Sequence, residues 1–463
     1  MKSRFPVACL LVGSAFAQSA APGETSAPKR PAYSFLRQNE DWSRFFVTDP
    51  VEDPVDPYKH MELSEDGRTW LSLGGRAEAR FESWSNFGFA SPNDDSFVVS
   101  RLLAHADLHV GEAFRLFVEG KTAQATDRDL PGGRRTLDMD TIDLQQAFVD
   151  LRFDLDGGQL RLRPGRQMLL FGAQRLVSPL PWGNTLRTWE GITAEWSAGP
   201  WTITGLATVF VPVDKTDFNT PDDEQTLWGL YAQRKPTEGH PGLDLFALGN
   251  ERPDVTINGT TGNEQRLTLG TRVFATHGVF DYEVEAAIQK GEVGNQDVDA
   301  WSFASQVGWK PEGWSGSPRL WFGLDAASGD DASGGDVGTF HQLFPLGHAY
   351  FGFIDAVGRQ NIIDTSLGGQ WSLDEKTTAG FGVHSFRLME TSDALYNAGG
   401  AVSRTGFDNS DVGTELDLSA THKVDRHTQI YGGLSRFWAG DGLASTGPDE
   451  DTDFLYLGVR TTF

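Results

Sequence analysis

The chain has 463 residues, including 53 glycines, 31 phenylalanines and 14 tryptophans, yet only 39% of its residues are hydrophobic and its formal net charge is -25. The negative charge argues against nucleic-acid binding, which needs clustered cationic surface, and no run beyond residue 17 approaches the roughly 18 apolar residues of a membrane-spanning helix. Many aromatic residues in a polar average composition are typical of barrels whose strands alternate apolar and polar side chains.

The first 17 residues predict an export signal. Lys2 and Arg4 form its charged start, an apolar run covers residues 5–16, and Ala15-Phe16-Ala17 has the small-x-small pattern of a cleavage site. The only cysteine, Cys9, lies within this signal. The mature chain is therefore expected to have no disulfide and no cysteine-bound metal.

Residues 18–68 are rich in proline and lack sustained periodicity, which predicts a periplasmic N-terminal segment that is ordered only in part. From residue 69 to residue 463 the hydrophobicity alternates with period two, as a β-barrel requires. We expect eighteen strands, near residues 69–84, 97–110, 114–123, 141–154, 159–167, 187–197, 200–212, 226–234, 242–251, 265–275, 279–290, 298–309, 318–327, 361–372, 377–387, 411–422, 429–438 and 454–463. Each has about the 9–11 residues of a tilted transmembrane strand.

The connections between these strands alternate between short and long. Short turns are expected near 111–113, 155–158, 198–199, 277–278 and 423–428, and long loops at 124–140, 168–186, 213–225, 252–264, 328–360, 388–410 and 439–453. Bacterial outer-membrane barrels have short periplasmic turns and longer extracellular loops. The sequence thus predicts an all-β, 18-stranded antiparallel transmembrane β-barrel in the cell outer membrane, with membrane lipid as one partner.

The last strand ends the chain on Phe463 and resembles the C-terminal signal of barrels that are inserted by the outer-membrane assembly machinery. That machinery is a second expected partner.

Four segments resemble the alginate export family of outer-membrane proteins, over about residues 35–463. Two are common among barrels: 36–42 before the strand at 71–80, and 101–108 leading into 114–119. Two are distinctive: Pro164-Gly165-Arg166-Gln167 with the following 171–177, and Ala327-Ser328-Gly329-Asp330 opening a loop that contains 340–345 and 348–352. The resemblance implies an eighteen-stranded barrel that passes a polyuronate, or a related acidic or neutral saccharide.

If apolar residues face lipid, one wall of the lumen is rich in arginine, whose planar guanidinium pairs with carboxylates. With Arg166, which the resemblance marks, the expected substrate-binding residues are Arg76, Arg80, Arg101, Arg115, Arg152, Arg161, Arg163, Arg166, Arg187 and Arg460. The opposite wall is expected to be acidic, with Asp244, Asp281, Glu283, Glu285, Asp325, Asp364, Glu415 and Asp417. The alternative for any one arginine is a salt bridge to an acid on a neighbouring strand.

Three other sequence patterns are weaker evidence for a functional site. His105, Asp107 and His109 alternate along one strand about 6.8 Å apart, too far to chelate one ion, and the acidic loop 328–336 lacks EF-hand spacing. Neither a metal nor a cofactor is therefore expected. The set Trp84, Trp182, Trp189, Trp301, Trp309 and Trp371 includes candidates for stacking on sugar rings, but most tryptophans near strand ends are predicted to belong to the interfacial girdle.

These observations favour a passive channel for an anionic polysaccharide such as alginate, or its oligomers, working with periplasmic export or uptake proteins. A general or sugar-acid uptake porin is the open alternative. An outer-membrane enzyme would need a nucleophile, a base and an acid at one site; Ser305, His384 and Asp364 can be named, but they lie on distant strands and carry no motif. A surface adhesin would have a plugged, non-conducting lumen.

Overall fold

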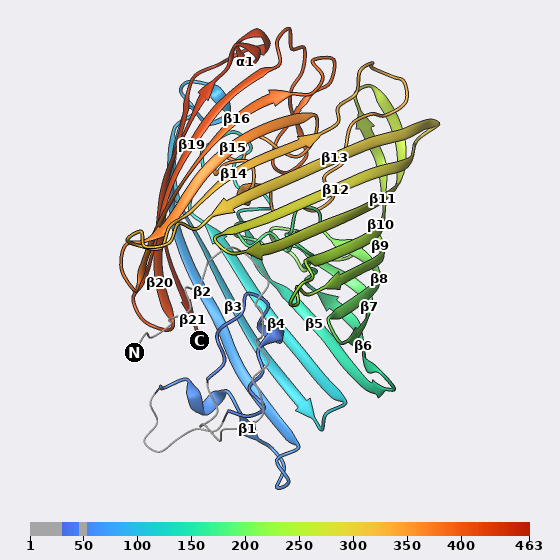
Figure 1. Cartoon of the computed structure of the whole chain (residues 1–463), viewed down its shortest axis with the longest axis vertical. Helices are drawn as coiled ribbons and strands as arrows, with labels where there is room; N and C mark the ends of the chain where they lie inside the picture. The colour runs from blue at the N-terminus through green and yellow to red at the C-terminus, as the bar shows by residue number, and fades with distance from the viewer. Residues whose placement is uncertain (1–29, 46–52) are drawn as a thin grey trace.

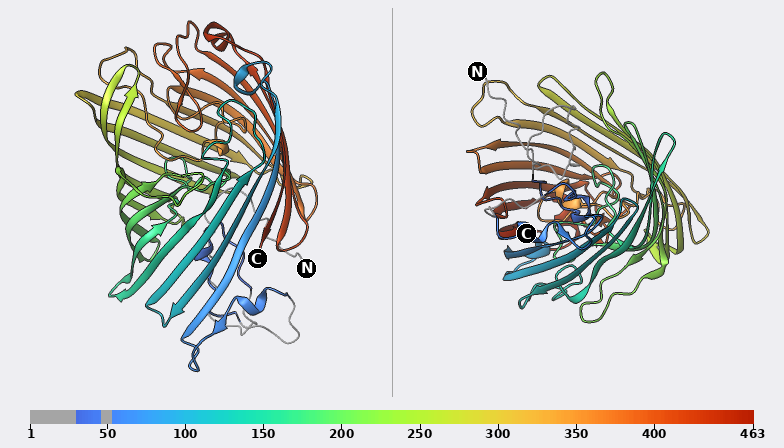
Figure 2. Two further views of the ribbon diagram at one scale, coloured as in Figure 1. Left: turned by 180° about the vertical axis from the view of Figure 1, so that it is seen from behind. Right: turned by 90° about the horizontal axis from the view of Figure 1, so that it is seen from below.

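The computed structural model describes residues 30–45 and 53–463, so the predicted export signal lies outside the described residues. One antiparallel sheet closes into a barrel, because β2 (Thr69–Ser85) pairs with both β3 (Asp95–Val110) and β21 (Thr452–Thr462). Figure 1 shows the strands tilted around a common interior, and Figure 2 shows the same barrel from behind and from below. A two-residue strand, β1 (Met61–Glu62), pairs with β2 where β21 has already ended.

The remaining long strands follow one another around the barrel, each paired with its neighbours in the sequence. They are β4 (Phe114–Ala125), β5 (Asp140–Leu155), β6 (Gly158–Gln167), β7 (Thr188–Ala198), β8 (Trp201–Val211), β9 (Asp222–Arg234), β10 (Gly242–Ile257), β11 (Thr260–His277), β12 (Phe280–Val293), β13 (Gln296–Trp309), β14 (Arg319–Ala327), β15 (Ile362–Ser372), β16 (Thr377–Leu388), β19 (Asp411–Lys423) and β20 (Thr428–Ala439). These fifteen and the three above make eighteen, which confirms the predicted strands and their order.

The smaller elements are not part of the barrel wall. A hairpin of β17 (Leu395–Tyr396) and β18 (Val402–Arg404) and the short α-helix α1 (Asp441–Thr446) belong to connections at the long-loop end. In the part of the chain that the structure describes, four 3-10 helices, each of one turn, lie at Arg37–Asn39, Asp56–Tyr58, Phe87–Phe89 and Gly347–Ala349. No helix in the described ranges has the length and apolar character needed to cross a membrane.

One predicted long loop is wrong. Residues 252–264 continue the strands, so that β10 and β11 are joined by Asn258 and Gly259 alone. Both residues have positive φ, 41° and 86°. Asn-Gly is the preferred pair for a two-residue hairpin turn of this kind, because both positions need left-handed backbone, and this signal was the one to read in the sequence.

The two faces of the wall differ as the alternation predicts. Outward-facing apolar side chains remain exposed over many strands, as in Leu73, Leu102, Ile192, Leu230, Leu269, Ile288, Phe322, Leu367, Leu418 and Leu457. Such a broad apolar surface suits lipid, since soluble proteins rarely expose patches of this size. Trp301 and Trp309 lie on this outer face, as a girdle requires, whereas Trp84, Trp182 and Trp189 lie inside the barrel and so cannot belong to the girdle.

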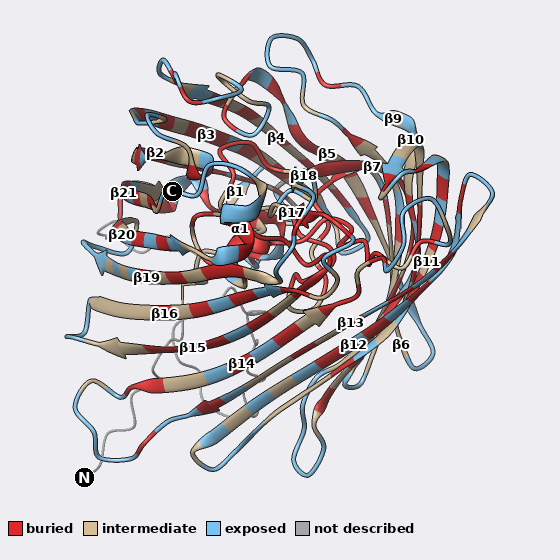
Figure 3. Cartoon of the chain, turned by 90° about the horizontal axis from the view of Figure 1, so that it is seen from above, coloured by how far each residue is buried: buried red, intermediate tan, exposed pale blue. Residues whose placement is uncertain are grey.

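The interior is largely filled. Figure 3, seen from above, shows buried segments inside the ring of strands. The hydrophobic core lies inside the long-loop half and includes residues of the connections 168–187 and 328–361. Inward aromatic side chains of the wall pack against these connections, Tyr231 on Phe171 and Trp189 on Phe344. We name these connections the first and second inward loops. At the short-turn end, the described N-terminal residues 30–45 lie against the inner wall, where Gln38 hydrogen-bonds Gln146 of β5.

Candidate channel lumen

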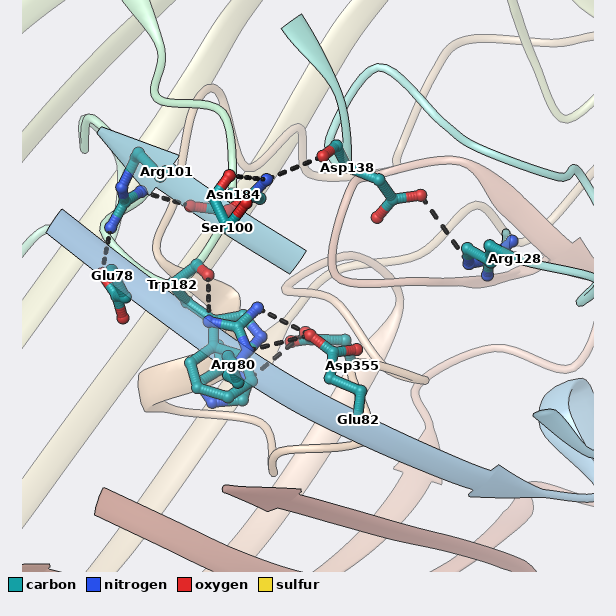
Figure 4. A network of polar contacts seen from close by, with 12 residues as sticks. Glu78, Arg80, Glu82, Ser100, Arg101, Arg128, Asp138, Trp182, Asn184 and Asp355 are labelled. Atoms are coloured by element: carbon teal, nitrogen blue, oxygen red, sulfur yellow. Dashed lines mark hydrogen bonds and ion pairs between the residues drawn. The ribbon is translucent and has the colours of Figure 1, made fainter. Parts of the chain in front are cut away.

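The first inward loop is tied to the wall by two of the predicted arginines. Arg80 of β2 donates to the carbonyl of Trp182 (3.0 Å), and Arg101 of β3 donates to the carbonyl of Gly183 (2.6 Å). Asn184 completes the attachment, because its side-chain amide donates to the carbonyls of Ser100, Gln124 and Asp138. Figure 4 shows this network. These arginines therefore hold a loop across the lumen.

The two inward loops interlock. Phe344 donates its backbone N–H to the carbonyl of Leu176 (2.8 Å), and Ser178 donates to the carbonyl of Phe344 (2.9 Å). The Trp182 ring stacks on His348 with 3.8 Å between centroids. Backbone groups of each loop are hydrogen-bond partners for the other, so the two loops form one packed unit. This unit narrows the lumen of the barrel.

Two arginines, one from each inward loop, form ion pairs with the acidic wall. Arg175 of the first inward loop pairs with Glu283 and lies 3.6 Å from Glu285, both on β12. Burial alone lowers the pKa of Arg175, but Tyr350 and these carboxylates together raise it above its ordinary value, so the guanidinium stays charged. Arg359 of the second inward loop pairs with Asp325 through two contacts of 3.0 and 2.5 Å.

Arg175 and Asp325 of these ion pairs also line a chamber of about 190 Å³. Small residues on the wall make room for it, among them Gly323 of β14, Ser366 of β15 and Gly382 of β16. Its functional side chains combine aromatic rings, hydrogen-bond acceptors and one guanidinium, supplied by Arg175, Trp321, Asp325, Tyr350, Asp364, His384 and Asp417. An apolar ring face with a few placed polar groups is the usual chemistry of small-solute sites.

The N-terminal residues cover part of the arginine wall. Arg115 donates to the carbonyl of Gln38 (2.8 Å), and Arg76 donates to the carbonyl of Ser34 (3.3 Å). The open part of the barrel is therefore displaced toward β13–β19, where the chamber lies. Sequence analysis missed this arrangement, because the segment has no periodicity to mark what it packs against.

Nine of the ten predicted arginines lie on the inner side, and most are paired. Arg80 contacts Glu82, Arg161 contacts Glu195, and Arg101 and Arg460 share Glu78. Arg115, Arg152 and Arg163 all lie within 4.0 Å of Asp150, and Arg115 also contacts Asp107. Arg76 and Arg187 make backbone contacts instead. Glu119, Asp140 and Asp143 lie in the same wall, the last two against Lys121. Nine guanidiniums and one ammonium therefore face eight carboxylates.

Arg152 and Arg161 stand apart within this set. They are directly opposite each other on β5 and β6, and their side chains are 30% and 24% exposed. Like charges directly opposite on neighbouring strands repel each other. Because both remain accessible at the short-turn end, they can attract an anion from solution.

The prediction that Arg166 lines the lumen is wrong. Its partner in the sheet is Glu190, and the next pair, Gln167 and Trp189, faces inward, where Trp189 packs on Phe344. Strand alternation therefore puts Arg166 on the outer face. There it contacts Asp143 of β5 and Glu190 of β7 and donates to the carbonyl of Asn219. It therefore links β5, β6 and β7 at the point where the first inward loop begins.

The named catalytic set is only partly assembled. His384 and Asp364 lie on neighbouring strands, contrary to expectation, and their side chains are hydrogen-bonded at 2.9 Å. Ser305 pairs in the sheet with Leu324, an outward residue, so its side chain faces away from them. His109 contacts Asp107 at 3.1 Å, but no group of three metal-ligating side chains occurs within 30–45 and 53–463.

Comparison with known proteins gives a family and a fold. The sequence pattern described as alginate export matches residues 69–456. Similar solved structures include OccK11 (OpdR) of Pseudomonas aeruginosa (TM-score 0.56, 12% identity, covering 88% of this chain and 98% of that one) and OccAB2 of Acinetobacter baumannii (0.58, 12%, 84% and 98%). A third is OccK2 (OpdF) of P. aeruginosa in complex with glucuronate (0.54, 11%, 87% and 98%). No curated protein matches the sequence.

Proposed function

The chain belongs to the alginate export family of outer-membrane barrels, and we propose that this member is a passive channel for anionic saccharides, namely uronate polymers or their oligomers. The observation that carries the proposal is the pair Arg152 and Arg161, which are opposed and accessible at the periplasmic end. Together with Arg115 and Arg163 they form a cluster of four guanidiniums around three carboxylates, those of Asp107, Asp150 and Glu195. An excess of fixed positive charge raises the local concentration of anions and speeds their entry.

The opposite, acidic wall is suited to the hydroxyl groups and the ring of a uronate. Asp325, Asp364 and Asp417 offer acceptors for sugar hydroxyls in the chamber, and Trp321 offers a flat apolar face. A uronate has a carboxylate and several hydroxyls, so it can orient with the carboxylate toward the arginines and the hydroxyls toward the acids. Many weak contacts of this kind allow passage, because no single one holds the solute tightly.

The test is single-channel recording of the full-length barrel with uronate oligomers added to one side. The wild-type current is expected to favour anions and to show transient block, and Trp321→Ala should shorten the blocks several-fold. Trp309→Ala is the matched control, since Trp309 lies on the outer face and is 38% exposed. If a neutral oligosaccharide of equal length blocks as strongly as the uronate, the preference for acidic saccharides is refuted.

A second candidate is uptake of single sugar acids. It is favoured by the interlocked inward loops, which leave a chamber of about 190 Å³ and not a wide bore, and the similar barrel OccK2 was solved with glucuronate. Reversal potentials measured in gradients of uronate monomers, trimers and decamers separate the two. Permeation that stops above the monomer favours sugar-acid uptake, whereas permeation by decamers favours polymer transport.

A further inference from the structure

A second cavity, of about 250 Å³, lies at the long-loop end and shares no lining residue with the chamber. Its walls come from the end of β10, the stem of the second inward loop and the loop around β18. Val255, Ile257 and Phe340 give it an apolar side. One water occupies only about 30 Å³ of the liquid, so the cavity has room for a solute larger than water.

Two buried polar atoms in its lining lack a hydrogen-bond partner within the described ranges: Nδ1 of His341 and Oε1 of Gln360. The two residues are 8% and 4% exposed. A buried polar group without a partner is unfavourable and needs a reason. Both residues line the cavity, and an imidazole and a carboxamide are suited to hydroxyl groups.

The third polar feature is the guanidinium of Arg252. Arg252, which lines the cavity, and Arg266 both pair with the single carboxylate of Glu264, at 2.6 and 2.9 Å. Burial, and then the proximity of Arg252, keep the pKa of His341 well below its usual value, so the imidazole is neutral. The carboxylate of Asp393 lies behind the lining and already accepts hydrogen bonds from Thr339 and Tyr396. Arg252 is the one guanidinium among the lining residues, so it is where the cavity can bind a carboxylate.

From these contacts we propose that the cavity is an outer binding site for one residue of an acidic saccharide, with the carboxylate on Arg252 and the hydroxyls on Gln360 and His341. The ring would lie against Val255 and Ile257. The identity of the ligand rests on the proposed function, since a barrel that handles uronates would meet them at this mouth. The site itself is separate from the chamber.

Calorimetry on the detergent-purified full-length barrel tests the proposal, with D-glucuronate as the probe and D-glucose as the neutral comparison. Arg252→Gln should weaken glucuronate binding about tenfold and leave glucose unchanged, because a charge-assisted contact is lost. Gln360→Leu should weaken both sugars. Ala401→Trp places a large ring in the exposed rim and should abolish the site. Arg436→Gln is the matched control, because Arg436 is an exposed arginine that lines neither the chamber nor this cavity.

A chamber variant separates this inference from the proposed function. Ser366→Trp should fill the chamber and stop uronate permeation, while the Arg252-dependent heat remains. If the wild-type barrel binds glucuronate through Arg252 but does not pass uronates, the outer site stands and the proposed function fails. If uronates permeate but all three outer-site variants bind glucuronate like the wild type, the cavity holds water only and the inference fails. Equal affinity for glucose and glucuronate would also overturn the assignment.

Discussion

Phe463, the last residue, and Gly75 of β2 exchange a pair of backbone hydrogen bonds, of 2.8 Å from Gly75 to Phe463 and 3.0 Å in return. A Cβ at Gly75 would lie only 2.7 Å from Cζ of the Phe463 ring, so the ring lies on bare backbone. Arg37 of the N-terminal segment also donates to the Phe463 carbonyl at 3.0 Å. The end of the chain therefore joins the barrel seam to the segment inside it.

We predict that Gly75→Val and Phe463→Asp each lower the amount of barrel inserted in the outer membrane while leaving export unchanged. Valine would crowd both the Phe463 ring and the backbone carbonyl of Leu103 on β3, which a Cβ at Gly75 would approach even more closely than the ring; such overpacking typically costs about 1–3 kcal/mol. Asp at position 463 removes the ring without touching Leu103. Gly120→Ala is the control, because a Cβ there meets nothing closer than 3.9 Å. Heat-modifiable barrel in the membrane fraction is the measurement. Wild-type amounts for both variants would refute a role for this seam.

The strands could be predicted from the sequence because each lies between lipid and a polar interior, which imposes period two from Trp70 to Phe463. The same alternation put Arg163 inside correctly and, applied to Arg166, would have put it outside. The lumen position of Arg166 was predicted from the motif resemblance and not from the alternation. In the structure Arg166 links neighbouring parts of the wall at the point where the first inward loop begins. The Asn258-Gly259 pair is itself a sequence signal for a two-residue hairpin turn, in place of the long loop predicted at 252–264.

The interior could not be predicted in the same way. Loops and the N-terminal residues pack inside without any period, so nothing in Gln38 or Trp182 indicates that it meets Gln146 or Arg80. Sequence therefore identified which arginines face inward but not which of them hold loops. That distinction requires the three-dimensional contacts, and it divides the arginines into loop anchors such as Arg101 and accessible groups such as Arg152.

The docking of the N-terminal segment should depend on pH through Lys59. Burial, and then the charge of Arg37, lower the pKa of Lys59 to about 8, and its Nζ donates to the carbonyl of Leu73 (2.7 Å). Between pH 8 and the ordinary value of 10.5 the released segment binds more protons than the docked one. Docking should therefore strengthen as pH rises through this window, and stay at its weaker level below pH 8.

Hydrogen exchange of residues 30–45 between pH 7 and 10.5, corrected for the intrinsic rate, measures this effect. Lys59→Met should remove the part of the pH dependence that belongs to the ammonium, on the order of 1–3 kcal/mol. Lys376→Met, at an exposed turn, is the control. An identical pH profile in the wild type and in Lys59→Met would show that the buried ammonium does not govern docking.

Arg80 and Arg101 are predicted to hold the first inward loop across the lumen. The double variant Arg80→Gln and Arg101→Gln removes the donors to Trp182 and Gly183, so conductance and open-channel noise should both rise while the barrel remains folded. Arg319→Gln is the matched control, because Arg319 pairs with Asp281 and Gln306 of the wall and with no loop. Unaltered conductance in a folded double variant would mean that the interlocked loops hold without these anchors.

The last prediction concerns Arg152 and Arg161, which are opposite each other in the sheet and whose side chains remain accessible. Two unit charges 4 Å apart in water interact by about 1 kcal/mol, so each arginine contributes a modest attraction for a passing anion. Changing both to Gln should lower the anion-to-cation permeability ratio a few-fold without unfolding the barrel. Changing both to Lys keeps the charges and should keep most of the ratio, which makes it the control for side-chain shape.

Salt provides the decisive arm of this experiment. The Debye length falls from about 10 Å at 0.1 M to about 3 Å at 1 M, so the difference between the wild type and the double Gln variant should shrink as salt rises. Uronate block should weaken in the same variant and show the same salt dependence, because the same charges attract the carboxylate. A double Gln variant that folds and keeps both its selectivity and its uronate block at low salt would show that this wall does not guide anions.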